Sequence, residues 1–105
     1  MPGFDAIYYT YWYRDVVQYG HGPLEHYLKV GWREGRDPSA GFSTDGYLET
    51  NPDVKASGNN PLMHFLDYGL AEGRAGWAKA PNLPAPRPRV VAPDAPQKLL
   101  APPRP

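Results

Sequence analysis

Three histidines are the side chains of this sequence best suited to hold a metal ion or to move a proton. His21 and His26 are five residues apart, whereas two ligands on one face of a helix need an i, i+4 spacing. His26 and His64 are 38 residues apart and occupy matching places in two similar stretches of the chain. A histidine that both stretches keep beside apolar residues is more simply a packing or capping residue. We therefore expect neither a metal nor a cofactor.

The remaining groups that catalysis uses are thiols, carboxylates and hydroxyls. The chain has no Cys, which excludes a disulfide scaffold, a thiolate metal site and a Cys nucleophile. Acid–base catalysis by carboxylates needs a pair of groups with different pKa values. No such partner lies at helical spacing from Glu25, Glu34 or Glu72. The serines stand in turn or helix-cap contexts, without a nucleophile motif. We therefore expect that the protein is not an enzyme.

The tripeptide Glu-Gly-Arg is the polar feature that the chain repeats most clearly, and it ends with Arg36 and with Arg74. As structure, it is a glycine that stops a helix, followed by a cation near the last carbonyls. As function, the two arginines would contact an anion or a glycan, because a guanidinium donates in a bidentate fork. We favour the structural interpretation and keep the anion or glycan contact as the alternative.

Residues 1–76 contain one unit twice. An ungapped comparison at an offset of 38 gives identical residues at 13 of 38 positions, which is a strong signal of an internal repeat. The copies span residues 4–41 and 42–76, and a third copy would need an aromatic residue where the chain has Ala80. We therefore expect a repeat domain of two copies over residues 1–76.

The first helix-start signal lies near the beginning of each copy. Asp5 and Ser43 are good N-caps, and each follows a Phe and precedes a Tyr at the spacing of a hydrophobic staple. A second start follows in copy two at Asn51-Pro52-Asp53. Copy one has Tyr13-Arg14-Asp15 there, so we expect its first helix to run on.

The third start, at Gly22-Pro23 and at Asn60-Pro61, opens a helix with one apolar face. The face consists of Leu24, Tyr27, Leu28 and Trp32 in copy one and of Leu62, Phe65, Leu66 and Leu70 in copy two. Gly31 and Gly69 are expected to end or loosen this helix. No stretch has the β-branched alternation of a strand. We predict an all-α fold in which two 38-residue helical repeats pack face to face as helical hairpins.

The composition changes near residue 76. Residues 77–105 hold 9 of the 14 prolines, and they carry 5 basic and 1 acidic side chains against 6 basic and 10 acidic in residues 1–76. A segment this poor in apolar residues favours disorder or polyproline II, so we predict a Pro-rich, basic, disordered tail. Its best local feature is Leu83-Pro84-Ala85-Pro86-Arg87-Pro88-Arg89, typical of a ligand for an aromatic-lined groove, although a solvated spacer is the simpler interpretation. The opposite charges of tail and body also permit contact between them.

The combined motifs resemble a short bacterial tandem repeat. The matching residues are Phe4-Asp5, Tyr8-Tyr9, Asp15-Val16 and segments 22–28 and 31–39 in copy one, with Asn51-Pro52-Asp53-Val54 in copy two. That repeat is a non-catalytic module found beside glycosyltransferases and other enzymes of surface polysaccharide metabolism. The resemblance covers residues 1–76, and it implies association with such enzymes and no catalytic residues.

Aromatic residues that only one copy has are the best candidates for a binding surface. Copy one has Tyr8, Tyr11, Trp12 and Tyr13 where copy two has none of these rings. A fold needs the residues that both copies share, and one helix buries about one face, so some of these rings are expected to be exposed. We predict a partner-binding surface of these four residues with Trp32 and Arg33.

Three hypotheses follow from this surface. The first is a protein-interaction or scaffold module that docks on a polysaccharide-building enzyme or on another copy of itself, with the tail as a tether or second contact. The second is glycan binding by the same rings, and the third is a fragment of a longer repeat-bearing glycosyltransferase. The acidic body argues against nucleic acid as a partner. The sequence shows no signal peptide and no apolar run of about 18 residues, so a cytoplasmic location is expected.

Overall fold

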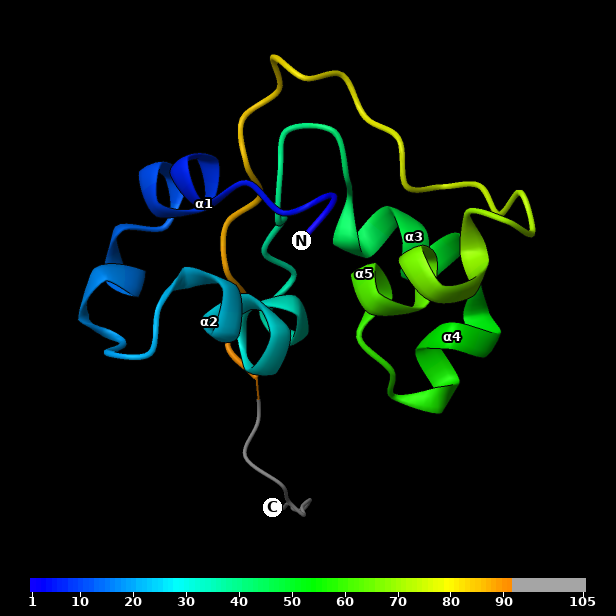
Figure 1. Ribbon diagram of the computed structural model, residues 1–105, viewed down its shortest axis with the longest axis horizontal. Coiled ribbons are helices and arrows are strands. Elements are labelled where there is room, and N and C mark those ends of the chain that lie inside the picture. The colour runs from blue at the N-terminus through cyan, green and yellow to red at the C-terminus, as the bar shows by residue number, and fades with distance from the viewer. Residues whose placement is uncertain (92–105) are drawn as a thin grey trace, which may run out of the picture.

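The computed structural model describes residues 1–91, and its regular elements are helices (Figure 1). The elements of copy one are α1 (Ala6–Trp12), the 3₁₀ helix η1 (Arg14–Gln18), α2 (Pro23–Lys29) and the 3₁₀ helix η2 (Gly31–Glu34). Those of copy two are α3 (Thr44–Thr50), α4 (Pro52–Ser57), α5 (Pro61–His64) and the π-helical turn η3 (Phe65–Gly69). Within residues 1–91, β-pairing is limited to isolated bridges at Phe42. The prediction of an all-α fold is confirmed.

The predicted helix caps are present in both copies. Asp5 Oδ1 accepts hydrogen bonds from the backbone N–H groups of Ile7 and Tyr8, at 3.0 and 3.1 Å. Ser43 Oγ accepts from the backbone N–H of Gly46 at 2.9 Å. These bonds satisfy N–H groups that the first turn of a helix leaves without a partner.

The staple rings also meet as predicted. The ring centroids of Phe4 and Tyr9 are 5.5 Å apart, and those of Phe42 and Tyr47 are 5.7 Å apart. Each staple therefore fixes the angle at which the chain enters the first helix of its copy.

The first helix of copy one does not run on, which corrects the prediction made from Tyr13-Arg14-Asp15. It ends at Trp12, and Tyr13 has φ −124° and ψ 78°, almost the same angles as Asn51 in copy two (−123° and 75°). The Tyr13 side chain leaves the helix direction because it is drawn into the core, where it is 3% exposed. Both copies thus keep the break, although only copy two carries the Asn-Pro signal for it.

The predicted apolar face of the third helix holds for most of its length but not at Leu70, which is 61% exposed. After α5, the chain forms the π-helical turn η3, in which the backbone N–H of Leu70 donates to the carbonyl of Phe65 at 2.8 Å. Because a π turn holds more residues than an α turn, it shifts the register of all that follows. The i+8 position therefore no longer faces the core.

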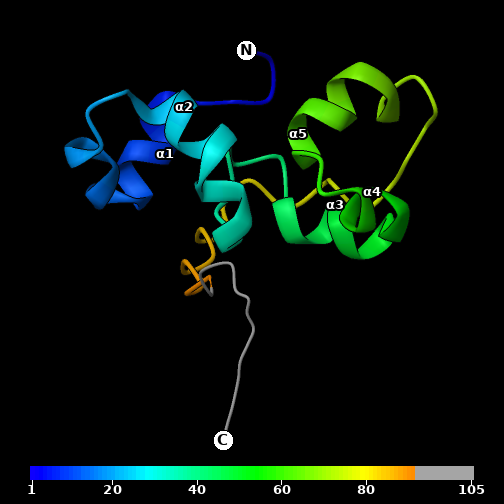
Figure 2. The same cartoon turned by 90° about the horizontal axis from the view of Figure 1, so that it is seen from below.

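The two copies form two lobes that lie side by side in both views (Figures 1 and 2). Buried polar contacts join them, since the hydroxyls of Tyr27 and Thr44 are 2.8 Å apart and Thr44 Oγ1 also donates to the carbonyl of Arg36 at 2.7 Å. Asn60 Nδ2 donates to the carbonyl of Leu28 at 3.3 Å. These side chains reach from one lobe to the other and help to hold the lobes together.

The first part of the tail lies against the body, so the prediction of disorder is wrong for residues 77–91. Trp77 packs on Phe65 with ring centroids 5.0 Å apart, and the chain then rises to the top of the view and descends beside copy one (Figure 1). Lys79 forms an ion pair with the buried Asp37. The basic tail thus makes ion pairs with the acidic body, a contact that their opposite charges permit. The rest of the predicted tail, residues 92–105, lies outside the described residues.

Candidate interaction surface

The two matching histidines each pack against a tyrosine of their own lobe, and His26 is buried whereas His64 is partly exposed. Tyr9 Oη and His26 Nδ1 share a hydrogen bond of 2.7 Å, and Tyr47 Oη and His64 Nδ1 share one of 2.9 Å. Burial is the main cause that lowers the pKa of His26 below its ordinary value, and the Arg36 guanidinium adds to it. Among residues 1–91, no three His, Asp or Glu side chains are grouped as a metal ion would require.

Arg36 is occupied inside the protein, which favours the structural interpretation of Glu-Gly-Arg over the alternative of an anion or glycan contact at this residue. Its side chain is 4% exposed. Its Nη atoms donate to both carboxylate oxygens of Asp15 at 2.8 and 2.6 Å, and its Nε donates to Glu34 at 2.7 Å. The carboxylate of Asp15 has a lowered pKa because of these bonds.

Arg74 makes the corresponding contacts in copy two. Its Nε donates to Glu72 at 2.7 Å, and its Nη1 donates to Asp53 at 2.8 Å and to Asn51 at 3.3 Å. The side chain is 25% exposed, more than that of Arg36. Each arginine therefore ties the end of its copy to the residues that follow the first helix.

Tyr13 does not belong to an exposed surface, which corrects the prediction for this residue. Its hydroxyl accepts from the backbone N–H of Asp37 at 3.1 Å and donates to the carbonyl of Pro86 at 2.8 Å. The guanidinium of Arg36 lies over its ring, 4.9 Å from the centroid. In copy two, Asn51 Nδ2 reaches the carbonyl of Ala75 at 3.0 Å, so both side chains tie the break after the first helix to the end of the copy.

The outward face of α1 carries the other predicted rings. Tyr11 and Trp12 are 64% and 41% exposed, and Tyr8 is half-buried beside them. Trp12 lies 5.3 Å from Tyr11 and 6.3 Å from Tyr8, measured between ring centroids. Ile7, which is 84% exposed, extends this face. We call these four residues the α1 surface.

The prediction missed Ile7, although its i, i+4 spacing to Tyr11 places both on one side of a helix. Ile7 and Tyr11 line a shallow hollow of about 510 Å³ together with Ala6, Thr10 and Arg14. The tail borders the same face, because Lys79 Nζ donates to Tyr8 Oη at 3.1 Å. The α1 surface is therefore an apolar patch with a polar border.

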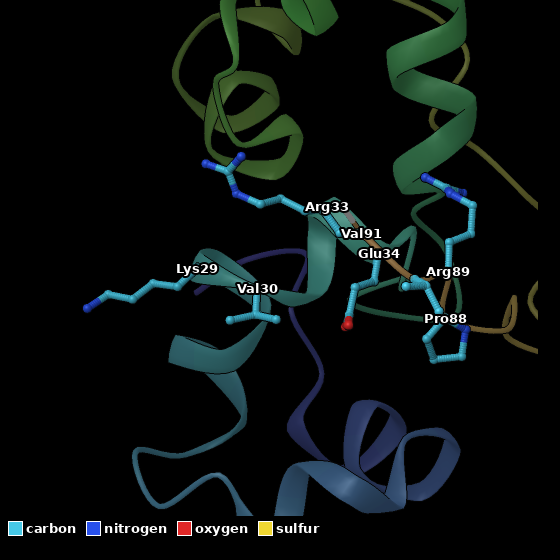
Figure 3. A pocket seen from close by; sticks show the side chains of 8 residues that line it. Lys29, Val30, Arg33, Glu34, Pro88, Arg89 and Val91 are labelled. Atoms are coloured by element: carbon cyan, nitrogen blue, oxygen red, sulfur yellow. The ribbon is translucent and has the colours of Figure 1, made fainter. Parts of the chain in front are cut away.

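Trp32 and Arg33 lie on η2, not on α1. The guanidinium of Arg33 covers the Trp32 ring at 4.7 Å from the centroid. Arg33 also lines a pocket of about 470 Å³ between η2 and the tail (Figure 3), with Lys29, Val30, Glu34 and residues 88–91. The side chains predicted to bind a partner therefore belong to separate elements.

Comparisons with known proteins give no match for this chain. No family model matches it, no curated protein is significantly similar in sequence, and no solved structure matches the fold. In the described part of the chain, no helix has the length and apolar character that crossing a membrane requires.

Proposed function

We propose that this chain is a non-catalytic interaction module that docks on a partner protein through the α1 surface. The observation that carries this proposal is the exposure of Tyr11 and Trp12 beside Ile7 on one helix face. Aromatic side chains of this kind are enriched at the centres of protein interfaces, where polar groups form the rim. Arg14 and Lys79 provide such groups at the border of the patch.

A partner that builds bacterial surface polysaccharide is our proposal for the binding protein, and it rests on the resemblance of residues 1–76 to the glycosyltransferase-associated repeat. The internal pairing of polar side chains supports a role without catalysis. Arg36, His26 and Asp37 all face other groups of the chain instead of a reactant.

The arrangement of the rings argues against the glycan alternative. A sugar stacks on rings that lie along a shared groove, whereas the ring planes of Tyr11 and Trp12 are nearly perpendicular at 87°. The planes of Tyr8 and Trp12 meet at 52°. A flat protein contact places fewer demands on ring orientation, so protein docking is the function that the geometry supports best.

A pull-down from lysate of the source cell tests this proposal. The wild-type chain is expected to retain one defined protein, and Trp12→Ala and Tyr11→Ala are expected to lose it. Tyr68→Ala is the matched control, because Tyr68 is an aromatic residue that is 59% exposed on η3, away from α1. Circular dichroism would confirm that all variants stay helical.

Two results would contradict the proposal. If Tyr68→Ala lost the partner as completely as Trp12→Ala, binding would not be located on the α1 surface. If no variant and no wild-type chain retained a protein, while wild type bound oligosaccharides of bacterial surface polysaccharide in calorimetry, the glycan hypothesis would replace it.

A further inference from the structure

A short Pro-rich segment of the tail lies against its own body. We call residues 83–89 the strap. Prolines at 84, 86 and 88 fix φ near −65°, and each restricts the residue before it to extended backbone. The strap is the segment whose composition is typical of a ligand for an aromatic-lined groove.

The body holds the strap by contacts that suit such a ligand. Tyr13 Oη donates to the carbonyl of Pro86 at 2.8 Å. The backbone N–H of Arg89 donates to the carbonyl of Glu34 at 2.8 Å, and its guanidinium makes two bonds to the carboxylate of Asp45, at 2.5 and 3.1 Å. An aromatic hydroxyl thus binds a proline carbonyl and an acid binds the arginine three residues later. We call Tyr13, the Glu34 carbonyl and Asp45 the strap groove.

Gly35 provides the space for the arginine. A Cβ on Gly35 would lie 2.4 Å from Arg89 Nη1 and 3.0 Å from Asp45 Oδ2, whereas nothing lies within 4 Å of the same position on Gly73 in copy two. Figure 3 shows the Arg89 side chain extending away from η2 and the neighbouring Pro88. The Arg89 site is thus formed at the end of copy one, where the chain itself provides the occupant.

The strap is held weakly in comparison with the start of the tail. Leu83 and the Arg89 side chain are 51% and 57% exposed, and Ala85 is the strap residue that packs on the core. Lys79, by contrast, is paired with an Asp37 side chain that is 3% exposed. A segment with few buried apolar contacts opens at low free energy. The strap can therefore open while residues 77–79 stay in place.

We propose that the strap groove is a binding site for a Pro-rich, arginine-bearing segment, and that its occupant in trans is the strap of a second copy of this chain. Exchange of straps between two copies replaces each contact by an identical one, so its main cost is the entropy of association. A short tether gives the strap an effective concentration on the order of mM in its own groove. Exchange between wild-type chains therefore needs protein concentrations in that range, or a weakened contact in cis.

Anisotropy of a labelled peptide tests the groove in the full-length chain. The probe is fluorescein-labelled Leu-Pro-Ala-Pro-Arg-Pro-Arg-Val-Val, the sequence of residues 83–91. Arg89→Asp frees the groove, so this variant should bind the peptide at least about tenfold more tightly than wild type. Arg87→Asp is the matched control, because it changes the charge by the same amount. Arg87 is exposed and forms no ion pair with the described residues. Equal binding by the two variants would overturn the proposal.

Mixing two full-length variants tests the second copy as the occupant. Arg89→Asp and Asp45→Arg each place like charges in their own groove, but in a mixture each strap meets a groove of opposite charge. Sedimentation should show a heterodimer in the equimolar mixture at a concentration where each variant alone is a monomer. A mixture that stays monomeric, although both variants are helical by circular dichroism, would overturn exchange. If Asp45→Arg is not helical, sedimentation of the wild type is compared with that of Arg89→Asp near 1 mM instead. A dimer of the wild type supports exchange, whereas monomers of both proteins overturn it.

Discussion

The hydroxyl of Tyr9 occupies the space that a side chain on Gly31 would need. A Cβ on Gly31 would lie 1.9 Å from Tyr9 Oη, and a Cβ on Gly69 would lie 2.0 Å from Tyr47 Oη. In each copy the same hydroxyl bonds a histidine, so Tyr, His and Gly form one packed unit at identical spacing. These glycines are thus required by the tyrosine that packs on them, and α2 has already ended at Lys29 before Gly31.

Gly31→Ala should therefore destabilise the fold. The added methyl group forces the Tyr9 ring out of a site where it is 0% exposed, and overpacking of this kind costs roughly 1–3 kcal/mol. Urea denaturation would measure the change in the free energy of unfolding. Gly41→Ala is the control, because nothing lies within 4 Å of a Cβ there.

A double-mutant cycle identifies the hydroxyl as the cause. In a Tyr9→Phe background the atom nearest to the new Cβ is gone, so Gly31→Ala should cost clearly less than in the wild type. The same cost in both backgrounds would show that the backbone, not the tyrosine, requires glycine at this position.

Local features of the fold could be predicted from the sequence because they depend on neighbouring residues. The caps at Asp5 and Ser43 and the staples to Tyr9 and Tyr47 need only a few consecutive side chains. The burial of Tyr13 could not be predicted in this way, because it depends on Asp37 and on a tail carbonyl more than 70 residues away.

The pairing of Arg36 is an intermediate case. Its partners Asp15 and Glu34 have identical counterparts in copy two, as does Arg36 itself, so the repeat contained the signal for an ion-pair cluster. Helical spacing alone could not bring Asp15 to Arg36, because the two are 21 residues apart. Residues that both copies keep but that lie far apart are therefore best interpreted as partners of one another.

Arg36→Met should destabilise the protein more than Arg74→Met, although the two arginines make corresponding ion pairs. Methionine keeps the apolar stem, so the comparison isolates the charged bonds. The loss at Arg36 should be about 2 kcal/mol, because the substitution removes charge-assisted hydrogen bonds to Asp15 and Glu34 that the buried side chain makes. Arg74 is partly solvated and should show a smaller loss. Thermal denaturation of both variants shows which one loses more stability. Equal losses would contradict the prediction.

The free energies of unfolding of Tyr13→Ala and Tyr11→Ala should distinguish a ring of the core from a ring of the α1 surface. Tyr13 is 3% exposed, so its truncation leaves a cavity and costs about 3–5 kcal/mol. Tyr11 is 64% exposed, and alanine is a good helix former, so the cost there should be below about 1 kcal/mol. Urea denaturation compares the two variants. A large loss at Tyr11 would mean that this ring packs within the fold and is not free for a partner.

His26 should make stability fall as the pH drops below about 6.5, its ordinary pKa. Burial and the Arg36 guanidinium lower the pKa of His26 in the folded protein, so the unfolded chain binds a proton first. Stability then falls with pH between 6.5 and the lowered folded value, by at most about 1.4 kcal/mol per pH unit for one proton. The lowered pKa of Asp15 acts in the same direction but below its ordinary 3.8. Burial raises the pKa of Asp37, which acts in the opposite direction.

Unfolding free energies of wild type and His26→Gln between pH 7.5 and 5 isolate the histidine, because Asp15 and Asp37 are present in both. The wild type should lose more stability over this range than His26→Gln does. His21→Gln, at a side chain that is 72% exposed, should follow the wild-type curve. Parallel curves for wild type and His26→Gln would show that burial and the Arg36 guanidinium do not hold His26 in its neutral form.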